Sequence, residues 1–178
     1  MPIDTCNELL GANIGWLRQA LSLLGQVDEV TFSSSPGGLA PHRVGGHLRH
    51  VLEFYECFLQ GLSSGRVDYD SRRRDETTES SRHSAAAKIC MILRRLEGFS
   101  SLAEDRRLEV RMEGADVYLR SSVGRELQAL SSHTIHHFAL IAITLRLHGV
   151  QVDPDLGMSP STLNYRTAKQ LAATSEAA

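Results

Sequence analysis

Histidine is the residue type whose placement in this chain points most directly to chemistry. The 178 residues include eight histidines, and most of them fall in two short windows, 42–50 and 133–137. Neutral imidazole is a common ligand of Zn²⁺, Ni²⁺ and Fe²⁺, so clustered histidines indicate a candidate metal site.

The second window reads His133-Thr134-Ile135-His136-His137. Residues four apart lie on one face of a helix, so His133 and His137 project side by side and are able to share a metal. Leu130 and Ile141 lie near the same face, which makes it the inward one. His136 is rotated by about 100° from His137 and points elsewhere.

The first window supplies a third imidazole from a neighbouring helix, either His47 or His50. Helical projection puts His47 at the edge of the apolar stripe and mildly favours it. Three imidazoles leave a coordination position for water or substrate, as in catalytic sites. The alternative is that these are hydrogen-bonded neutral histidines that bind no metal.

Four segments carry apolar residues at the three- and four-residue spacing of amphipathic helices. These segments are 5–24, 44–62, 84–98 and 122–148. The pattern predicts an all-α four-helix bundle, in which sites are built from side chains on facing helices.

Shorter features surround these four helices. Alternation at 108–112 and 117–119 predicts a small β-hairpin before the last long helix. The polar stretch 63–82 is expected to be a long loop, suited to a lid. A short helix is expected to begin at Ser159, with Pro160 in its first turn. The whole chain, 1–178, is predicted to be one domain with its core at about 5–150 and a C-terminal extension at 151–178.

The run His47-Leu48-Arg49-His50, with the apolar, aromatic and acidic residues after it, together with the His133–His137 motif, resembles the DinB-like (YfiT-like) family of metalloenzymes. The residues 145–149 match the usual end of that family's fourth helix. The chain is also similar to the metal-binding domain of the sulfoxide synthases that make ergothioneine. The resemblance implies a divalent ion (Ni, Zn, Fe or Mn) on His50, His133 and His137, with His47 as the reserve ligand. Where the family commonly has a glycine and a glutamine, this chain has residues 138–140, Phe-Ala-Leu, so the family's substrates do not carry over.

Other polar residues are weaker candidates. Glu126 lies two turns before His133, so it is placed to orient a ligand histidine or to act as a general base. Arg72 and Arg74, in the polar stretch, are suited to bind an anionic substrate because a guanidinium binds two oxygens at once. Cys57 follows His50 by two turns and is expected to be a core residue rather than a fourth ligand.

These features predict a metal-dependent enzyme acting on a small molecule. The resemblance implies either hydrolysis by water on the metal or transfer of a low-molecular-weight thiol. The alternative is a non-catalytic metal-binding module, or a stress-related dimeric bundle.

A net charge of −2 and the lack of a recognition motif argue against binding to nucleic acid, and no apolar run is long enough to span a membrane. The start has no signal-peptide pattern, so the expected location is the cytoplasm. We expect a homodimer, because two-fold pairing is the commonest assembly.

Overall fold

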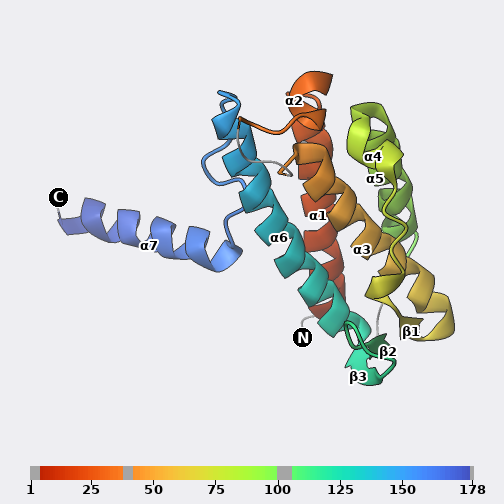
Figure 1. The fold of residues 1–178 in the computed structure, drawn as a ribbon. Helices are drawn as coiled ribbons and strands as arrows, with labels where there is room; N and C mark the ends of the chain where they lie inside the picture. The colour runs from red at the N-terminus through yellow and green to blue at the C-terminus, as the bar shows by residue number, and fades with distance from the viewer. Residues whose placement is uncertain (1–4, 38–41, 100–105, 177–178) are drawn as a thin grey trace.

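The computed structural model describes residues 5–37, 42–99 and 106–176 (Figure 1). These residues are mostly helical, with one small three-stranded sheet at one end of the molecule. The helices are α1 (Thr5–Leu24), α2 (Glu29–Ser33), α3 (Val44–Ser64), the 3-10 turn η1 (Tyr69–Ser71), α4 (Glu76–Ser80), α5 (Arg82–Glu97), α6 (Val123–Leu147) and α7 (Pro160–Glu176). The helix-dominated fold predicted from the sequence is confirmed.

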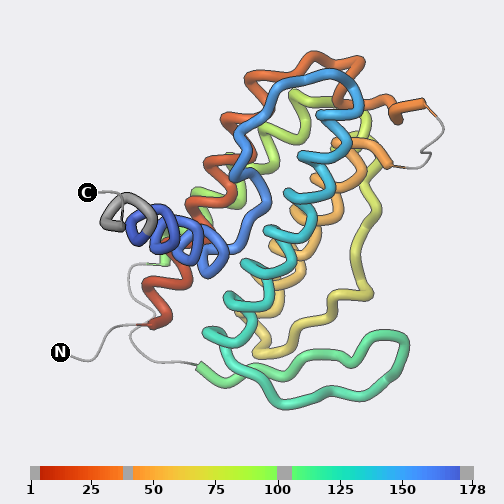
Figure 2. Tube along the Cα trace, turned by 90° about the vertical axis from the view of Figure 1, so that its left-hand side faces the viewer, coloured from red at the N-terminus to blue at the C-terminus, as the bar shows by residue number. Residues whose placement is uncertain are grey.

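Four long helices enclose the apolar core. Helix α1 contacts α5 and α6, and α3 contacts the same two helices from the other side. Figure 2 shows these segments running side by side along the length of the molecule. Each helix turns its apolar stripe inward, so that side chains such as Leu17, Leu52, Ile89 and Ile141 are almost completely buried.

The ends of these helices follow local sequence chemistry. Ser81 and Ser122 precede α5 and α6, and each side chain accepts a hydrogen bond from a backbone N–H in the first turn. Gly65 and Gly149 come after the C-terminal ends of α3 and α6, both with φ of 78°. Glycine adopts this left-handed conformation without the penalty that a Cβ imposes. The four long helices therefore begin and end within about two residues of the predicted bounds.

The predicted hairpin is present. Strand β2 (Arg107–Arg111) pairs antiparallel with β3 (Tyr118–Ser122), and Glu109 lies opposite Arg120. A third strand, β1 (Arg66–Val67), adds to β2 in parallel and was not predicted. A two-residue strand has no alternating pattern of its own that a sequence could reveal.

The polar stretch at 63–82 is not a simple loop. It contains β1, η1 and α4, and two aspartates cap its short helices: Asp68 before η1 and Asp75 before α4. Helix α2 was likewise not predicted, and its N-cap is Asp28. Elements of three to five residues are below the length at which helical periodicity becomes visible.

The C-terminal helix starts at Pro160 as expected but is longer than predicted, reaching Glu176. It projects away from the other helices (Figure 1), and all the described side chains of residues 160–172 except Leu163 are exposed. The segment before it packs on α6: Leu156 is buried in the core, and Gly157 lies so close to Ala139 that a Cβ would meet its backbone nitrogen at 2.2 Å.

Among the described residues, we find no helix whose length and apolar character would let it cross a membrane.

Adjacent glycines in the first turn of α3 test how closely α4 packs there. A Cβ on Gly45 would lie 2.0 Å from the Glu79 carbonyl oxygen, whereas one on Gly46 would meet only the Glu79 side chain, at 4.0 Å. We expect Gly45→Ala to lower the free energy of unfolding by about 1–3 kcal/mol through overpacking. Urea denaturation measures the change.

Gly46→Ala is the matched control and is expected to be neutral, or to stabilise by up to about 1 kcal/mol, because alanine restricts the unfolded chain. Equal effects of the two substitutions would show that α4 does not pack against α3 in this way.

Candidate metal centre

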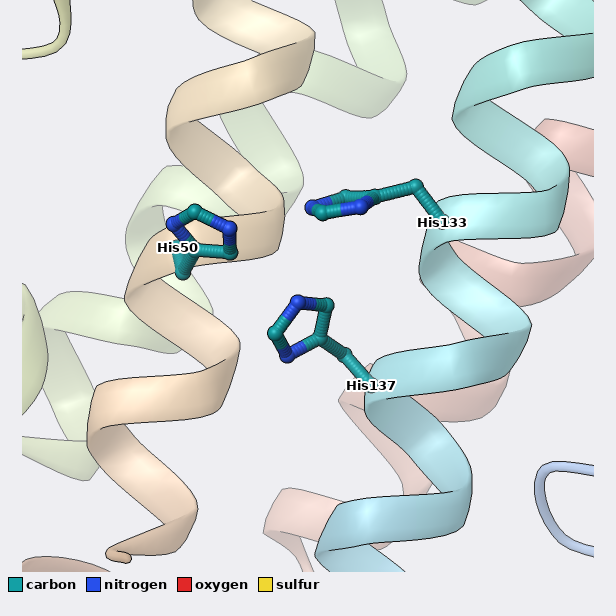
Figure 3. Close-up of side chains that lie close together, drawn as sticks. All are labelled: His50, His133 and His137. Carbon is teal, nitrogen blue, oxygen red and sulfur yellow. The ribbon is translucent and has the colours of Figure 1, made fainter. Parts of the chain in front are cut away.

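Three histidines from two adjacent helices face one another. His50 comes from α3, while His133 and His137 are one turn apart on α6 (Figure 3). Each offers one ligand nitrogen, and these three atoms all lie within 4.8 Å of one another. The ring centroids are 4.9 Å apart for His50–His133, 4.7 Å for His50–His137 and 4.5 Å for His133–His137. Among the described residues, these three are the group that is able to hold a metal ion.

Burial keeps these imidazoles neutral. All three are half-buried, and loss of hydration lowers the pKa of His50 and of His133 to about 4 and that of His137 to about 3. For His50 the positive charge of Arg72 lowers the pKa further, and for His133 and His137 the neighbouring histidines do so. Near neutral pH each ring therefore carries an unprotonated nitrogen, the form that binds a metal.

One of these nitrogens has no partner. His133 Nε2 is buried, and no hydrogen-bonding group of the described residues reaches it. Buried polar atoms are nearly always hydrogen-bonded, so an exception calls for a ligand or water. A neutral nitrogen aimed at two further imidazoles fits a divalent cation that accepts nitrogen ligands.

The remaining candidate ligands lie outside this group. His136 is exposed and sits beside His137 with ring centroids 5.3 Å apart, which agrees with the predicted rotation around the helix. Cys57 is buried, as expected of a core residue. Its sulfur lies 3.9 Å from Ser71 Oγ, and burial raises the pKa of the thiol. His47 contacts His137 through its ring, with 3.2 Å between their Nδ1 atoms.

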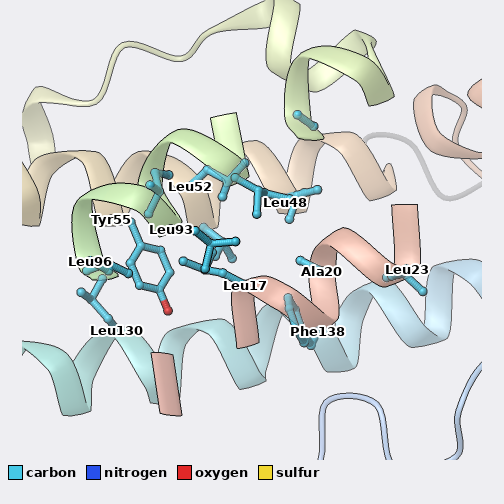
Figure 4. Packing of buried hydrophobic residues seen from close by; sticks show 14 of the residues in the cluster. Leu17, Ala20, Leu23, Leu48, Leu52, Tyr55, Leu93, Leu96, Leu130 and Phe138 are labelled. Carbon is cyan, nitrogen blue, oxygen red and sulfur yellow. The ribbon is translucent and has the colours of Figure 1, made fainter. Parts of the chain in front are cut away.

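A buried polar cluster fixes how α6 faces α3. Tyr55 on α3 is completely buried among apolar side chains (Figure 4). Its hydroxyl group donates to Asn13 Oδ1 on α1 at 2.7 Å. Thr134, next to His133 in the chain, places its Oγ1 3.1 Å from the same hydroxyl. Asn13 Nδ2 in turn donates to the carbonyl of Leu127 on α6. Leaving any of these groups unpaired would cost about 1–3 kcal/mol, so the cluster favours one alignment of the three helices.

An aromatic stack forms one wall of the site. Phe54 stacks on His133 with centroids 4.1 Å apart, and Tyr69 stacks on the same Phe54 at 4.9 Å. The Tyr69 hydroxyl donates to Glu126 Oε2 at 2.8 Å, while Ser121 donates to Oε1. Burial raises the pKa of Tyr69, and the nearby Glu126 carboxylate raises it further, so the phenol stays protonated as a donor.

Glu126 is thus buried and bonded to two hydroxyl groups, and neither bond goes to a histidine. These contacts favour a supporting role, in which the carboxylate holds Tyr69 in the stack. They lend no support to the general-base role predicted from its spacing to His133.

The two arginines predicted to bind substrate lie in different places. The Arg72 guanidinium lies over the Phe54 ring, 4.7 Å from its centroid, and donates to the Tyr69 carbonyl. Arg74 is exposed and lines a separate cavity of about 340 Å³ together with Arg43, Arg49 and Glu79. None of the three clustered histidines lines that cavity.

Charged groups attach the 66–75 segment to the helices. Glu53 on α3 is buried, and its Oε1 accepts from the Asp75 backbone N–H at 2.8 Å. Arg49 donates to the other oxygen of Glu53 at 3.0 Å. The Asp75 side chain accepts from Lys88 of α5 at 2.9 Å and caps α4. This network keeps Tyr69 and Arg72 next to Phe54, the ring that stacks on His133.

Sequence reasoning assigned no role in the site to Phe54, to Tyr69 or to the network around Asp75. Phe54 was visible as an aromatic residue one turn after His50, which would place it on the same helical face. Tyr69 had no comparable signal, because its position depends on η1 and on contacts across the fold.

The chain has one partial similarity to a known protein among those compared. No family model matches the chain. FK506-binding protein 5 of Rhizopus delemar is 35% identical to it over 105 residues, which make up 56% of this chain and 27% of that protein. The match thus spans little more than a quarter of the relative's length and does not bear on the DinB-like resemblance, which stays a prediction.

The Asp75 carboxyl makes the stability of the fold depend on pH. The Thr78 hydroxyl and the Lys88 ammonium hold the pKa of the Asp75 carboxyl below its ordinary value of 3.8. A lowered folded-state pKa adds stability that is present above 3.8 and is lost as the pH falls below it. We expect Asp75→Ala to lower the free energy of unfolding by about 0.5–2 kcal/mol at pH 7, largely through the lost cap. The difference from wild type should shrink between pH 4 and pH 2.5 in urea titrations.

Asp75→Asn separates the charge from the cap, since asparagine also caps helices well. It should retain part of the stability at pH 7. A difference between wild type and Asp75→Ala that stays constant at acid pH would contradict this role of the carboxylate.

Proposed function

We propose that this chain is a DinB-like metalloprotein that holds one divalent ion, Ni, Zn, Fe or Mn, on His50, His133 and His137. The observation that carries the proposal is the meeting of three neutral imidazoles from α3 and α6, with ligand atoms within 4.8 Å. The partnerless buried Nε2 of His133 supports it, because an ion would satisfy that atom.

The packing of the long helices supports the four-helix-bundle part of the proposal. Each of α1 and α3 contacts both α5 and α6, the arrangement expected when four helices surround one core. Facing helices of such a bundle commonly build metal sites from inward side chains, as α3 and α6 would here.

We further propose that the bound ion makes the protein an enzyme that acts on a small molecule. Three protein ligands leave at least one coordination position open. When bound, a divalent cation supplies Lewis-acid chemistry, which lowers the pKa of a coordinated water or thiol. Hydrolysis and transfer of a low-molecular-weight thiol both use this chemistry. The residues of this chain would position the ligand set, shield one side with Phe54 and Tyr69, and orient the substrate.

Arg72 is the residue we assign to substrate orientation. Its guanidinium lies over the Phe54 ring, which also stacks on His133, and its charge acts on both His50 and His133. A cation at that position favours a substrate with a carboxylate or phosphate group. Arg74 lines another cavity and is a weaker choice. Arg72→Gln should raise KM for anionic substrates more than for neutral analogues, and equal effects on both would count against the assignment.

A homodimer and a cytoplasmic location remain predictions. The exposed apolar residues of α7, Tyr165 and Leu171, are compatible with pairing.

Elemental analysis of gently purified, untagged protein tests the metal site. Wild type is expected to contain about one equivalent of Ni, Zn, Fe or Mn, because the part of the chain that the structure describes holds one three-histidine group. A His133→Ala, His137→Ala double variant should contain none, since it keeps only one imidazole of the ligand group.

His136→Ala is the matched control, because His136 lies on the same helix but outside the ligand group; it should keep the metal. Any hydrolase or thiol-transfer activity found with wild type should be absent from the double variant. Activity that persists without metal would refute the enzymatic proposal, and a metal-loaded protein without turnover would favour the non-catalytic alternative. No metal in wild type, even after incubation with all four ions, would refute the site itself.

A further inference from the structure

His47 is the histidine whose place in the site the ligand group does not explain. It precedes His50 by three residues on α3, and its Nδ1 lies 3.2 Å from Nδ1 of His137. The centroids of the two rings are 5.3 Å apart. His47 is nevertheless not part of the group whose ligand atoms lie within 4.8 Å of one another.

A contact of this length between two ring nitrogens needs a proton between them. Neutral imidazole has one N–H donor and one acceptor nitrogen, so the two rings are able to share the proton in only two ways. Either His47 donates and His137 accepts, or His137 donates and His47 accepts.

The two arrangements differ in what they leave for a metal. If His47 donates, neutral His137 carries its own proton on Nε2, and that nitrogen is closed to a cation. If His137 donates from Nδ1, its Nε2 keeps a free lone pair. Figure 3 shows one ring nitrogen of His137 directed toward the space between His50 and His133, and the other directed away from it. The nitrogen that His47 engages is Nδ1, so Nε2 is the one available to a metal.

We propose that His47 is a positioning residue that accepts the Nδ1–H of His137, and thereby holds that ring in the orientation and tautomer that present Nε2 to a metal ion. The inference rests on the proposed metal site and assigns a role within it that differs from ligation. Metal-binding histidines commonly donate their second ring nitrogen to such an acceptor, and removing the acceptor weakens metal binding by about 10–100-fold.

The surroundings of His47 restrain its ring but do not by themselves select its tautomer. The His42 ring stacks on it at 5.6 Å with an interplanar angle of 19°, which restrains the His47 ring. Its Nε2 is buried and meets no hydrogen-bonding group of the described residues. That atom lacks a partner in either tautomer, so burial does not choose between the two arrangements. Metal binding through Nε2 of His137 does select one of the two arrangements, because it requires the proton of that ring to be on Nδ1.

The test compares two substitutions at this position. The Oδ1 atom of asparagine is attached to Cγ, as Nδ1 of histidine is, so His47→Asn keeps an acceptor at the same reach. His47→Leu removes the acceptor but keeps a side chain of similar bulk. We expect His47→Leu to weaken zinc binding by about 10–100-fold in competition titrations with a chromophoric chelator, and His47→Asn to keep most of the wild-type affinity. Circular dichroism and thermal melting of the metal-free proteins check that both variants are folded.

Long-range ¹H–¹⁵N NMR of zinc-loaded wild type reports the tautomers directly and needs no variant. The expected result is a proton on Nδ1 of His137, and an unprotonated Nδ1 with a protonated Nε2 on His47.

Three outcomes would overturn the inference while leaving the three-histidine site intact. These are wild-type affinity in His47→Leu, equal loss in both variants, and a proton on His47 Nδ1 in the zinc-loaded protein. Equal loss would show that an acceptor at this position is not what holds the His137 ring. Failure of wild type to bind zinc would instead refute the proposed function, and this inference with it.

Discussion

The alignment of α3 with α6 is the constraint on which the candidate site depends. The two helices bring His50 opposite His133 and His137, and neither helix alone would form the group. Tyr55, Thr134 and Asn13 fix this alignment, because a shift of one helix would leave buried polar groups without partners. Apolar packing drives the helices together, but it is tolerant of small displacements. The buried hydrogen bonds are directional and select one arrangement. Thr134 lies next to His133 in the chain, so one turn of α6 holds both a residue that aligns the helices and a candidate metal ligand.

The surroundings of the histidines come from segments distant in the sequence. Phe54 and Tyr69 shield one side of His133, and Glu126 holds the Tyr69 hydroxyl. The segment that carries Tyr69 is in turn attached to α3 and α5 through Asp75. Low hydration in this environment keeps the imidazoles neutral and strengthens electrostatic interactions at the site. The position of Arg72 on the Phe54 ring adds a positive charge to the same wall.

The sequence was informative where periodicity extends over many residues. The four helices around the core are amphipathic over four or more turns, and their caps and terminal glycines are local, so their bounds were predicted closely. Helical geometry alone likewise predicts that His133 and His137 lie on the same face of α6. Short elements such as β1, η1 and α4 are too brief to show periodicity, and the N-cap aspartates of η1 and α4 are weak signals by themselves. The choice between His47 and His50 depends on the rotation of α3 about its own axis. Helical projection favoured His47, and the family resemblance favoured His50. In the structure His50 belongs to the group with His133 and His137, and His47 contacts His137 instead. The partners of Glu126 were unpredictable for a similar reason, because Tyr69 reaches it from a segment 57 positions away in the chain.

Anomalous diffraction from crystals of the metal-loaded protein, measured above and below the absorption edge of the bound metal, tests the three-histidine site most directly. The account predicts one anomalous peak per chain, between His50, His133 and His137, with nitrogen or oxygen atoms around it and no sulfur. It also predicts that His47 contacts His137 and not the ion. A peak at another place in the chain, coordination by Cys57, or a crystal soaked in each of the four ions with no peak at these histidines would contradict the account.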